Sequence, residues 1–244
     1  MTDRRKPFVV GDYYASPAGK QDFLRKIFDK TAPHYEGIAR WGWFGSGGIY
    51  RRNALLRAGV TPDMKVIDVA SGTGPVARAF MQILNSADQI VCVEPSAGMI
   101  AESRKTVPAV HHQSTAEALP VPDEDFDFLA MGFALRHVDN LEDSFREFRR
   151  VLKDGGKAFI MDVTMPEGAV GRFFFRAYFK TILPFFTLIF SRDREAYRLM
   201  KYYWETMEQM THRDEVVEIL LEAGFRKAEH KVVLGCFSEY LVER

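Results

Sequence analysis

The sequence predicts an α/β fold: a doubly wound parallel sheet that ends in an antiparallel C-terminal hairpin and carries a helical lid. Three observations lead to this prediction. Short apolar runs alternate with helical patterns through the middle of the chain, two strand-like runs close it, and helical segments rich in aromatic residues stand on either side of the middle. Strands that alternate with helices in this way are typical of a parallel sheet with helices on both faces.

Length and composition agree with one domain of this kind. The chain has 244 residues, 47% of them hydrophobic and 27% charged, which is enough apolar material for a full core. Lysine and arginine balance aspartate and glutamate at 33 each, so no overall basic excess points to nucleic acid. Cys92 and Cys236 lie in apolar runs and are interpreted as small buried side chains, which fits a reducing, cytoplasmic compartment.

Four segments are expected along the chain. An N-terminal helical lid segment comes first, a cofactor-binding α/β core second, a helical aromatic-rich lid insertion third, and a C-terminal helix and hairpin that complete the sheet last. Their predicted ranges are 1–58, 59–167, 168–212 and 213–244. The first residues are basic but lack a long apolar run, so no secretory signal is expected. The two lid segments supply no strands, so we expect them to cover the ligand-binding edge of the sheet.

The core and the tail supply the strands. We predict strands at 65–70, 89–94, 126–132 and 157–163, with helices between them at 75–84, 97–106 and 140–152. Asn140 is a suitable N-cap for the last of these helices, and the two glycines after Asp154 suit its C-terminal end. The tail, 225–244, is predicted to form two strands that meet at Gly235.

The loop after the first strand is rich in small residues. In open parallel sheets, ligands bind beyond the carboxyl ends of the strands, and Gly72 and Gly74 let the backbone pass close to a ligand there. Glu94 follows Gly74 by 20 residues, at the end of the next strand, where a carboxylate can accept both hydroxyls of a ribose. An ordinary tight turn and a solvated strand-end charge are the alternatives.

Asp68 is an acid inside the first apolar run. The loop lacks both the phosphate-binding signature and the third glycine of the dinucleotide fingerprint, and a carboxylate here would repel a pyrophosphate. The acid suits a cation instead. A ligand with ribose at one end and positive charge at the other, such as S-adenosyl-L-methionine, fits this arrangement. Asp68 could also orient the loop amides, and the two roles are compatible.

Motifs along the chain resemble those of class I S-adenosylmethionine-dependent methyltransferases, and more narrowly the C-methyltransferases of ubiquinone and menaquinone biosynthesis. The residues that carry the resemblance include "VIDVASGTGPVA" (66–77), "VCVEPSAGMI" (91–100), "STAEALPVPDEDFDFLAMGFALRHV" (114–138) and "FREFRRVLKDGGKAFIMDVTMPE" (145–167). The resemblance implies a Rossmann-like seven-stranded sheet and S-adenosyl-L-methionine as the cofactor.

The resemblance also implies which residues hold the cofactor. The glycine loop would lie against its methionine and ribose part, Glu94 would bind the ribose hydroxyls, and Ser96 with its neighbours would wall the adenine. Thr115 stands where these enzymes often carry an acid or amide that reads the adenine amino group. The predicted cofactor-binding residues are Asp68, Ala70, Gly72, Gly74, Glu94, Pro95, Met99, Thr115, Ala116, Glu117 and Phe133.

Three residues are candidates for catalysis. Arg136 and His137 follow the fourth strand, where quinone enzymes usually carry Asn in place of the histidine. Arg136 is the candidate cation beside a phenolate acceptor, and His137 is the candidate base because its ordinary pKa of about 6.5 suits that task. Tyr35 is a further candidate, and structural roles stay open for His137 and Tyr35. His111 and His112 are expected to be solvated before a strand, and no metal is expected.

The stretch 170–192 is the most apolar part of the chain. Arg172, Arg176 and Lys180 interrupt it, and a membrane-spanning helix needs roughly 20 apolar residues, so we do not expect it to span a membrane. Its phenylalanines suit a tunnel for a prenyl or acyl chain, and its basic residues, four apart, form a stripe that suits anionic headgroups. A cap on the sheet and a dimer surface are the alternatives.

Together these observations predict a methyltransferase with a small lipophilic acceptor, first of all C-methylation of a prenylated phenol or quinol. N-methylation of a phospholipid headgroup, and O- or N-methylation of an aromatic secondary metabolite, are the alternatives within the class. A non-catalytic cofactor-binding protein and a dehydrogenase are the alternatives outside it. We expect no nucleic-acid partner, a transient membrane-surface contact through 170–192, a cytoplasmic location peripheral to the membrane, and a homodimer as a further association.

Overall fold

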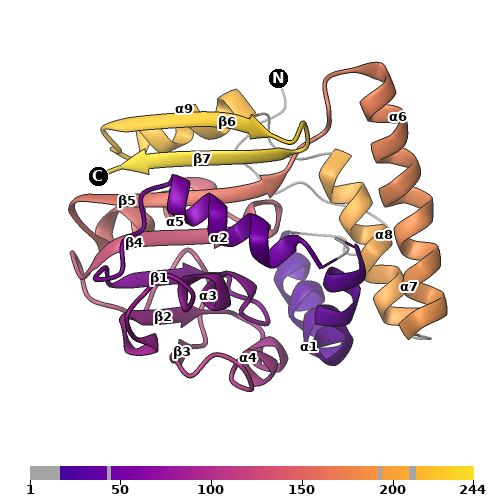
Figure 1. The fold of residues 1–244 in the computed structure, drawn as a ribbon, viewed down its shortest axis with the longest axis horizontal. Coiled ribbons are helices and arrows are strands. Elements are labelled where there is room, and N and C mark those ends of the chain that lie inside the picture. Colours follow the sequence, from indigo (N-terminus) through magenta and orange to yellow (C-terminus); the bar gives the residue numbers. More distant parts are fainter. Residues whose placement is uncertain (1–16, 43–44, 192–193, 209–212) are drawn as a thin grey trace.

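A seven-stranded sheet forms the centre of the computed structural model, which describes residues 17–42, 45–191, 194–208 and 213–244. The strands are β1 (Val66–Val69), β2 (Ile90–Val93), β3 (Val110–His112), β4 (Phe126–Gly132), β5 (Leu152–Val163), β6 (Lys227–Val233) and β7 (Phe237–Glu243). Their order is β3-β2-β1-β4-β5-β7-β6 (Figure 1). β7 pairs antiparallel with β5 and β6, whereas β1 to β5 are parallel. The predicted doubly wound sheet with its C-terminal hairpin is confirmed.

The strand order reverses at β1. The chain moves outward from β1 through β2 to β3, then returns to place β4 and β5 on the other side of β1. A crevice for a ligand forms at such a reversal, beyond the carboxyl ends of the two central strands. β1 and β4 therefore fix the position of the site.

Helices cover both faces of the sheet and one of its ends. They are α1 (Pro17–Gly42), α2 (Gly47–Arg57), α3 (Pro75–Phe80), α4 (Ala97–Ser103), α5 (Leu141–Val151), α6 (Ala169–Ala177), α7 (Leu183–Ser191), α8 (Arg194–Glu208) and α9 (Arg213–Glu222). Short 3₁₀ turns occupy Ala87–Gln89 and Leu135–His137, and a π-helical turn, Tyr178–Ile182, joins α6 to α7. Figure 1 shows α1, α6, α7 and α8 gathered at one end of the sheet.

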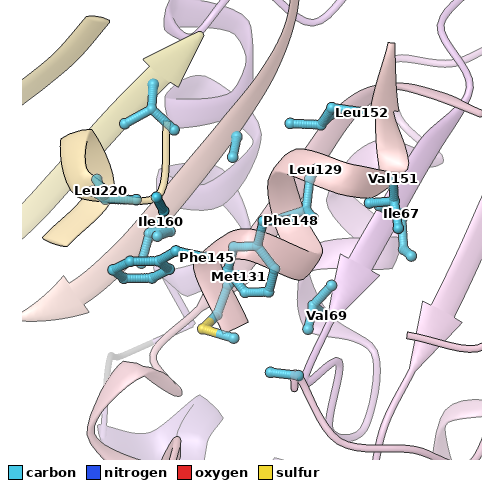
Figure 2. Close-up of a cluster of buried hydrophobic side chains, with 14 of the residues drawn as sticks. Ile67, Val69, Leu129, Met131, Phe145, Phe148, Val151, Leu152, Ile160 and Leu220 are labelled. Carbon is cyan, nitrogen blue, oxygen red and sulfur yellow. The ribbon is translucent and has the colours of Figure 1, made fainter. Parts of the chain in front are cut away.

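Two apolar layers hold the core together. On one face of the sheet, side chains from β1, β4 and β5 pack against α5 and α9 (Figure 2). On the other face, Val66, Phe128 and Phe159 pack against α2 and α3. Most of these side chains are fully buried, and each contributes about 1.5–3 kcal/mol relative to an exposed position. The strands are buried on both faces, which explains why the sequence reads as continuous apolar runs rather than as alternation.

The lid helices have a core of their own. Leu24 and Ile27 of α1 pack against Leu199, Met200 and Tyr202 of α8. Asp29 ties α1 to the start of α4, because its Oδ1 accepts hydrogen bonds from Ser96 Oγ (2.5 Å) and Gly98 N (2.9 Å). These contacts place the lid over the carboxyl ends of the parallel strands. Within the described part of the chain, no helix is both long and apolar enough to cross a membrane.

The structure corrects two local predictions. α5 begins after its predicted N-cap, Asn140, but it ends at Val151, and the glycines after Asp154 lie inside β5. Gly156 is needed there because a Cβ would lie 2.9 Å from the Lys153 carbonyl oxygen. His111 and His112 form β3 rather than preceding a strand, and both are partly buried.

Candidate active site

A cavity of about 680 Å³ opens at the carboxyl ends of the strands, between the sheet and the lid. The loops after β1, β2, β3 and β4 form its floor, and α1, α2, α7 and α8 with the π-turn form its walls. Polar side chains surround the end beside the loop after β1. The lid contributes six clustered apolar side chains to the lining, which we call the apolar end: Leu24, Phe28, Phe179, Leu183, Met200 and Met207. The cavity can therefore hold a polar ligand and an apolar one side by side.

The loop after β1 turns sharply through left-handed conformations. Ala70, Gly72 and Gly74 have φ of 54°, 55° and 83°. A Cβ on Gly72 would meet nothing within 4 Å, so this glycine faces the open cavity. A Cβ on Gly74 would lie 2.5 Å from Ser103 Oγ, and Gly74 does not line the cavity. Gly74 thus serves close packing against α4, and the structure does not place it as the predicted cofactor contact.

Glu94 is buried at the end of β2 and lines the cavity. Its carboxylate accepts hydrogen bonds from Gly72 N (2.9 Å) and Ser96 N (3.0 Å), so it joins the loop after β1 to the start of α4. Burial raises the pKa of Glu94 to about 7, although the two amide hydrogen bonds lower it. Hydroxyl groups that donated to this carboxylate would favour its ionised form.

Asp68 lies behind the loop rather than in the cavity. It is fully buried, and its Oδ2 accepts a hydrogen bond from Ala77 N (3.0 Å) in the first turns of α3. Its Oδ1 has no hydrogen-bond partner among the described residues, and burial raises the pKa of Asp68 to about 8. The structure therefore supports the alternative role, orientation of the loop and helix amides, and not direct contact with a cationic ligand.

The remaining predicted cofactor residues line the cavity. They are Ala70, Pro95, Met99, Thr115, Ala116, Glu117 and Phe133, together with Ser96. Glu117 Oε1 accepts hydrogen bonds from Asp139 N (2.9 Å) and Asn140 N (3.3 Å), so it also shapes the loop after β4. Phe133 has a φ of 63°, which turns its ring toward Tyr50 and Phe237. Their contacts with a cofactor stay predictions.

The three predicted catalytic residues lie together in the cavity wall. Arg136 Nη1 donates to Asp162 Oδ1 at 2.6 Å, and the guanidinium lies 4.7 Å from the centroid of the Tyr203 ring. Burial is the largest single influence and lowers the pKa of Arg136, but Asp162 and the neighbouring tyrosines together outweigh it, so the pKa of Arg136 is raised. Tyr203 also shares a hydrogen bond with Tyr35, with 2.8 Å between the hydroxyl oxygens. Tyr203 thus connects two of the three candidates.

His137 is enclosed by aromatic rings. Its ring stacks on Tyr202 with 5.8 Å between centroids, and Phe28 meets it edge-on at 5.5 Å. Neither ring nitrogen has a hydrogen-bond partner among the described residues. Burial, followed by the charges of Arg136 and Lys20, lowers the pKa of His137 well below its usual 6.5. The ring is therefore neutral at pH 7, and the ordinary pKa assumed from the sequence does not apply.

The structure adds residues to the site that carry no motif. Arg51 of α2 lines the cavity, donates to Gly47 O (2.9 Å) and lies 4.8 Å from the centroid of the Phe133 ring. Its Nε has no hydrogen-bond partner among the described residues, and burial lowers its pKa. Lys20 of α1 is buried and donates to Val138 O (3.0 Å) beside the catalytic candidates. Arg51 comes from a helix on the face of the sheet and Lys20 from the lid, and no local pattern distinguishes them from other basic residues on a helix.

Comparison with protein families matches residues 17–238 to the ubiE/COQ5 methyltransferase family. A demethylmenaquinone methyltransferase of Chlorobaculum parvum is 31% identical over 211 residues, which cover 84% of this chain and 86% of the relative. The ubiquinone/menaquinone biosynthesis C-methyltransferase UbiE of Shewanella sediminis is 30% identical over 218 residues, which cover 86% of each.

Solved structures share the fold at lower identity. A SAM-dependent methyltransferase of Thermotoga maritima superposes with a TM-score of 0.62 at 21% identity, covering 90% of this chain and 99% of the other. A phosphoethanolamine N-methyltransferase of Haemonchus contortus, solved with phosphomonomethylethanolamine and S-adenosylhomocysteine, gives 0.63 at 16% identity, covering 95% of this chain and 60% of the other. At these identities the likeness concerns the fold alone.

Proposed function

The chain belongs to the ubiE/COQ5 methyltransferase family, and we propose on this basis that it methylates a ring carbon of a prenylated phenol or quinol. As a member of the family it is an S-adenosylmethionine-dependent methyltransferase. The observation that carries the proposal is the shape of the cavity. A polar end beside the glycine loop adjoins an apolar end under the lid, and Arg136 lies in the wall between the loops and the lid.

Residues at the polar end suit the cofactor. When bound, S-adenosylmethionine supplies an electrophilic methyl group on a sulfonium. Gly72 leaves open space beside the loop, and the Glu94 carboxylate has lone pairs beyond the two amides that it accepts from. Glu94 would bind the ribose hydroxyls. Arg51 has an unpartnered Nε among the described residues, and a guanidinium there would hold the α-carboxylate of the methionine part.

Residues next to the apolar end suit a phenolic acceptor. A ring carbon becomes nucleophilic when the neighbouring hydroxyl loses its proton, and a fixed cation stabilises the resulting phenolate. Asp162 and Tyr203 hold Arg136 in one position, and its Nε has no hydrogen-bond partner among the described residues. His137 is neutral and can accept the hydroxyl proton, directly or through a water. Formation of the carbon–carbon bond would break the methyl–sulfur bond, with S-adenosylhomocysteine as the leaving group. The ring proton would then pass to water, which restores the aromatic phenolate, and the phenolate would recover its hydroxyl proton from His137.

The experiment compares acceptors with and without a prenyl chain. Purified protein is incubated with methyl-labelled S-adenosylmethionine and either a ring-demethylated prenyl quinol or the same ring without its chain. We expect label on a ring carbon of the prenylated compound, and a much higher KM for the unprenylated ring because the apolar end of the cavity stays unfilled. Label on an oxygen, or on a phospholipid headgroup from an added lipid extract, would instead support one of the alternative methylations.

A further inference from the structure

We propose that the outer face of α6, the π-turn and α7 docks on an anionic lipid bilayer. This aromatic face consists of exposed apolar side chains: Val170, Phe173, Phe174, Ile182, Phe185, Phe186 and Leu188. Phe173 and Phe174 are each 67% exposed, and Phe185 is 57% exposed. Exposed apolar side chains gathered in this way on one layer of helix mark an interaction site.

The two sides of the same helices explain why the face is unusual. Phe175 and Phe179 point inward and are buried at 8% and 9% exposure, and Thr187 continues that stripe with a hydrogen bond to Leu183 O. A helix on the surface of a soluble domain normally shows polar residues opposite such a stripe. Here the opposite side is aromatic. Figure 1 shows α6 and α7 as the outermost layer at their end of the molecule, with α8 between them and the sheet end.

Charge favours a bilayer with anionic lipids as the occupant. The sequence from 168 to 191 contains no aspartate or glutamate, and the exposed Arg172, Arg176 and Lys180 recur every fourth residue. Aromatic rings that enter the headgroup region beside basic side chains are typical of helices that lie in the plane of a membrane surface. A second copy of the chain on this face would bring the two basic stripes into one interface, which like-charge repulsion opposes.

The aromatic face is also the outer side of the cavity wall. Phe179 and Leu183, on the inner side of the π-turn and of α7, line the apolar end of the cavity. An acceptor with a long apolar chain would therefore have to cross only this layer of helix between the bilayer and the cavity. That delivery step rests on the proposed function, whereas the docking itself does not, because it requires only the outer face.

Vesicle flotation without any acceptor tests the docking. We expect the full chain to float with vesicles of phosphatidylcholine and phosphatidylglycerol at least about tenfold more than with phosphatidylcholine alone, and to be released as salt is raised to about 1 M, where the Debye length falls to about 3 Å. The variant F173S/F174S should lose at least about tenfold in binding at low salt, where the unaltered protein binds. The variant R172E/K180E should lose the preference for anionic vesicles.

Matched controls keep the test specific. Leu221 of α9 and Val110 of β3 are exposed at 46% and 52%, so L221S/V110S removes exposed apolar surface elsewhere. R104E/K105E reverses two exposed charges after α4. Both controls should bind vesicles like the unaltered protein, and all variants should methylate a short-chain acceptor in solution at the same rate. If neither the unaltered protein nor any variant methylates this acceptor, the proposed function is contradicted, whereas the docking result is unaffected.

Two results would overturn the docking proposal. One is that the protein does not bind anionic vesicles, or that neither F173S/F174S nor R172E/K180E weakens this binding. The other is a dimer, seen by light scattering coupled to size exclusion, that F173S/F174S converts to a monomer, because a second copy would then cover the aromatic face.

Discussion

The two halves of the site are assembled in different ways. The proposed cofactor half is built by loops at the ends of adjacent strands, so that Gly72 and Glu94 meet through one hydrogen bond across two consecutive β-α units. The proposed acceptor half is built by pairs far apart in the chain, such as Tyr35 with Tyr203. The first half depends on a local motif and the second on how the lid packs. The two halves should therefore fail separately when they are mutated.

Replacing Arg136 is expected to give the largest effect. Arg136→Ala should lower kcat about 10²–10³-fold because the cation beside the phenolate is lost. It should also lower the free energy of unfolding by about 3–5 kcal/mol, since the buried carboxylate of Asp162 loses its partner. Kinetics and urea unfolding measure the two effects.

A double variant separates activity from stability. R136A/D162N should regain most of the stability but none of the activity, and calorimetry should show unchanged binding of S-adenosylhomocysteine in both variants if they fold. Recovery of activity in the double variant, or loss of cofactor binding in it, would contradict the division into two halves.

The half of the site that depends on a local motif could be predicted from the sequence, whereas the geometry of the half that depends on the packing of the lid could not. The strands other than β3, the loop after β1 and Glu94 were predictable because each depends on residues adjacent in the chain. The neutral state of His137 was not, because it arises from enclosure by Phe28 and Tyr202 of the two lid segments. Arg51 likewise joins the cavity only through the position of α2.

Within the local motif, the sequence does not predict toward which side of the sheet or loop a residue points. Asp68 sits in a strand buried on both faces, and the sequence does not say which side reaches the cavity. The glycines after Asp154 suit a helix end and a strand irregularity equally. In the structure they belong to a strand irregularity, because the register between β4 and β5 shifts nearby, between Phe126 and Phe128.

The two glycines of the loop offer a second way to sharpen the comparison. Gly74→Ala should destabilise the protein by about 2–4 kcal/mol, because a φ of 83° is strained for alanine and its Cβ would collide with Ser103. Gly72→Ala should cost only about 1–2 kcal/mol but weaken binding of S-adenosylhomocysteine at least tenfold, since its Cβ enters the cavity. Thermal unfolding measures the stability of both variants, and calorimetry measures their binding of S-adenosylhomocysteine. Equal losses of stability would contradict the finding that Gly74 faces Ser103 and Gly72 faces the cavity.

Arg51 tests whether α2 also contributes to the cofactor half. Arg51→Ala should weaken S-adenosylhomocysteine about 10–100-fold, the effect of losing a hydrogen bond to a charged group. Binding of 5′-methylthioadenosine, which lacks the amino acid part, should hardly change. Arg52→Ala on the same helix is the control. An equal loss for both ligands would place Arg51 away from the α-carboxylate.

The smallest expected effect is a pH dependence confined to the cofactor half. The pKa of Glu94 is raised to about 7 in the free protein, and hydroxyl donors from a ribose would lower it in the complex, so binding releases a proton below pH 7. Affinity for S-adenosylhomocysteine should therefore rise about tenfold from pH 6 to pH 8, where the free carboxylate is already ionised. Calorimetry in two buffers of different ionisation enthalpy counts the protons released.

Asp68 is the neighbouring group that could produce the same trend, because burial and the charge of Glu94 raise the pKa of Asp68 to about 8. The two are distinguished by Asp68→Asn, which can keep the hydrogen bond from Ala77 N through its amide oxygen. Glu94→Gln should abolish the pH dependence and Asp68→Asn should preserve most of it. The reverse result would mean that the acid behind the loop, and not the one that lines the cavity, senses the bound cofactor.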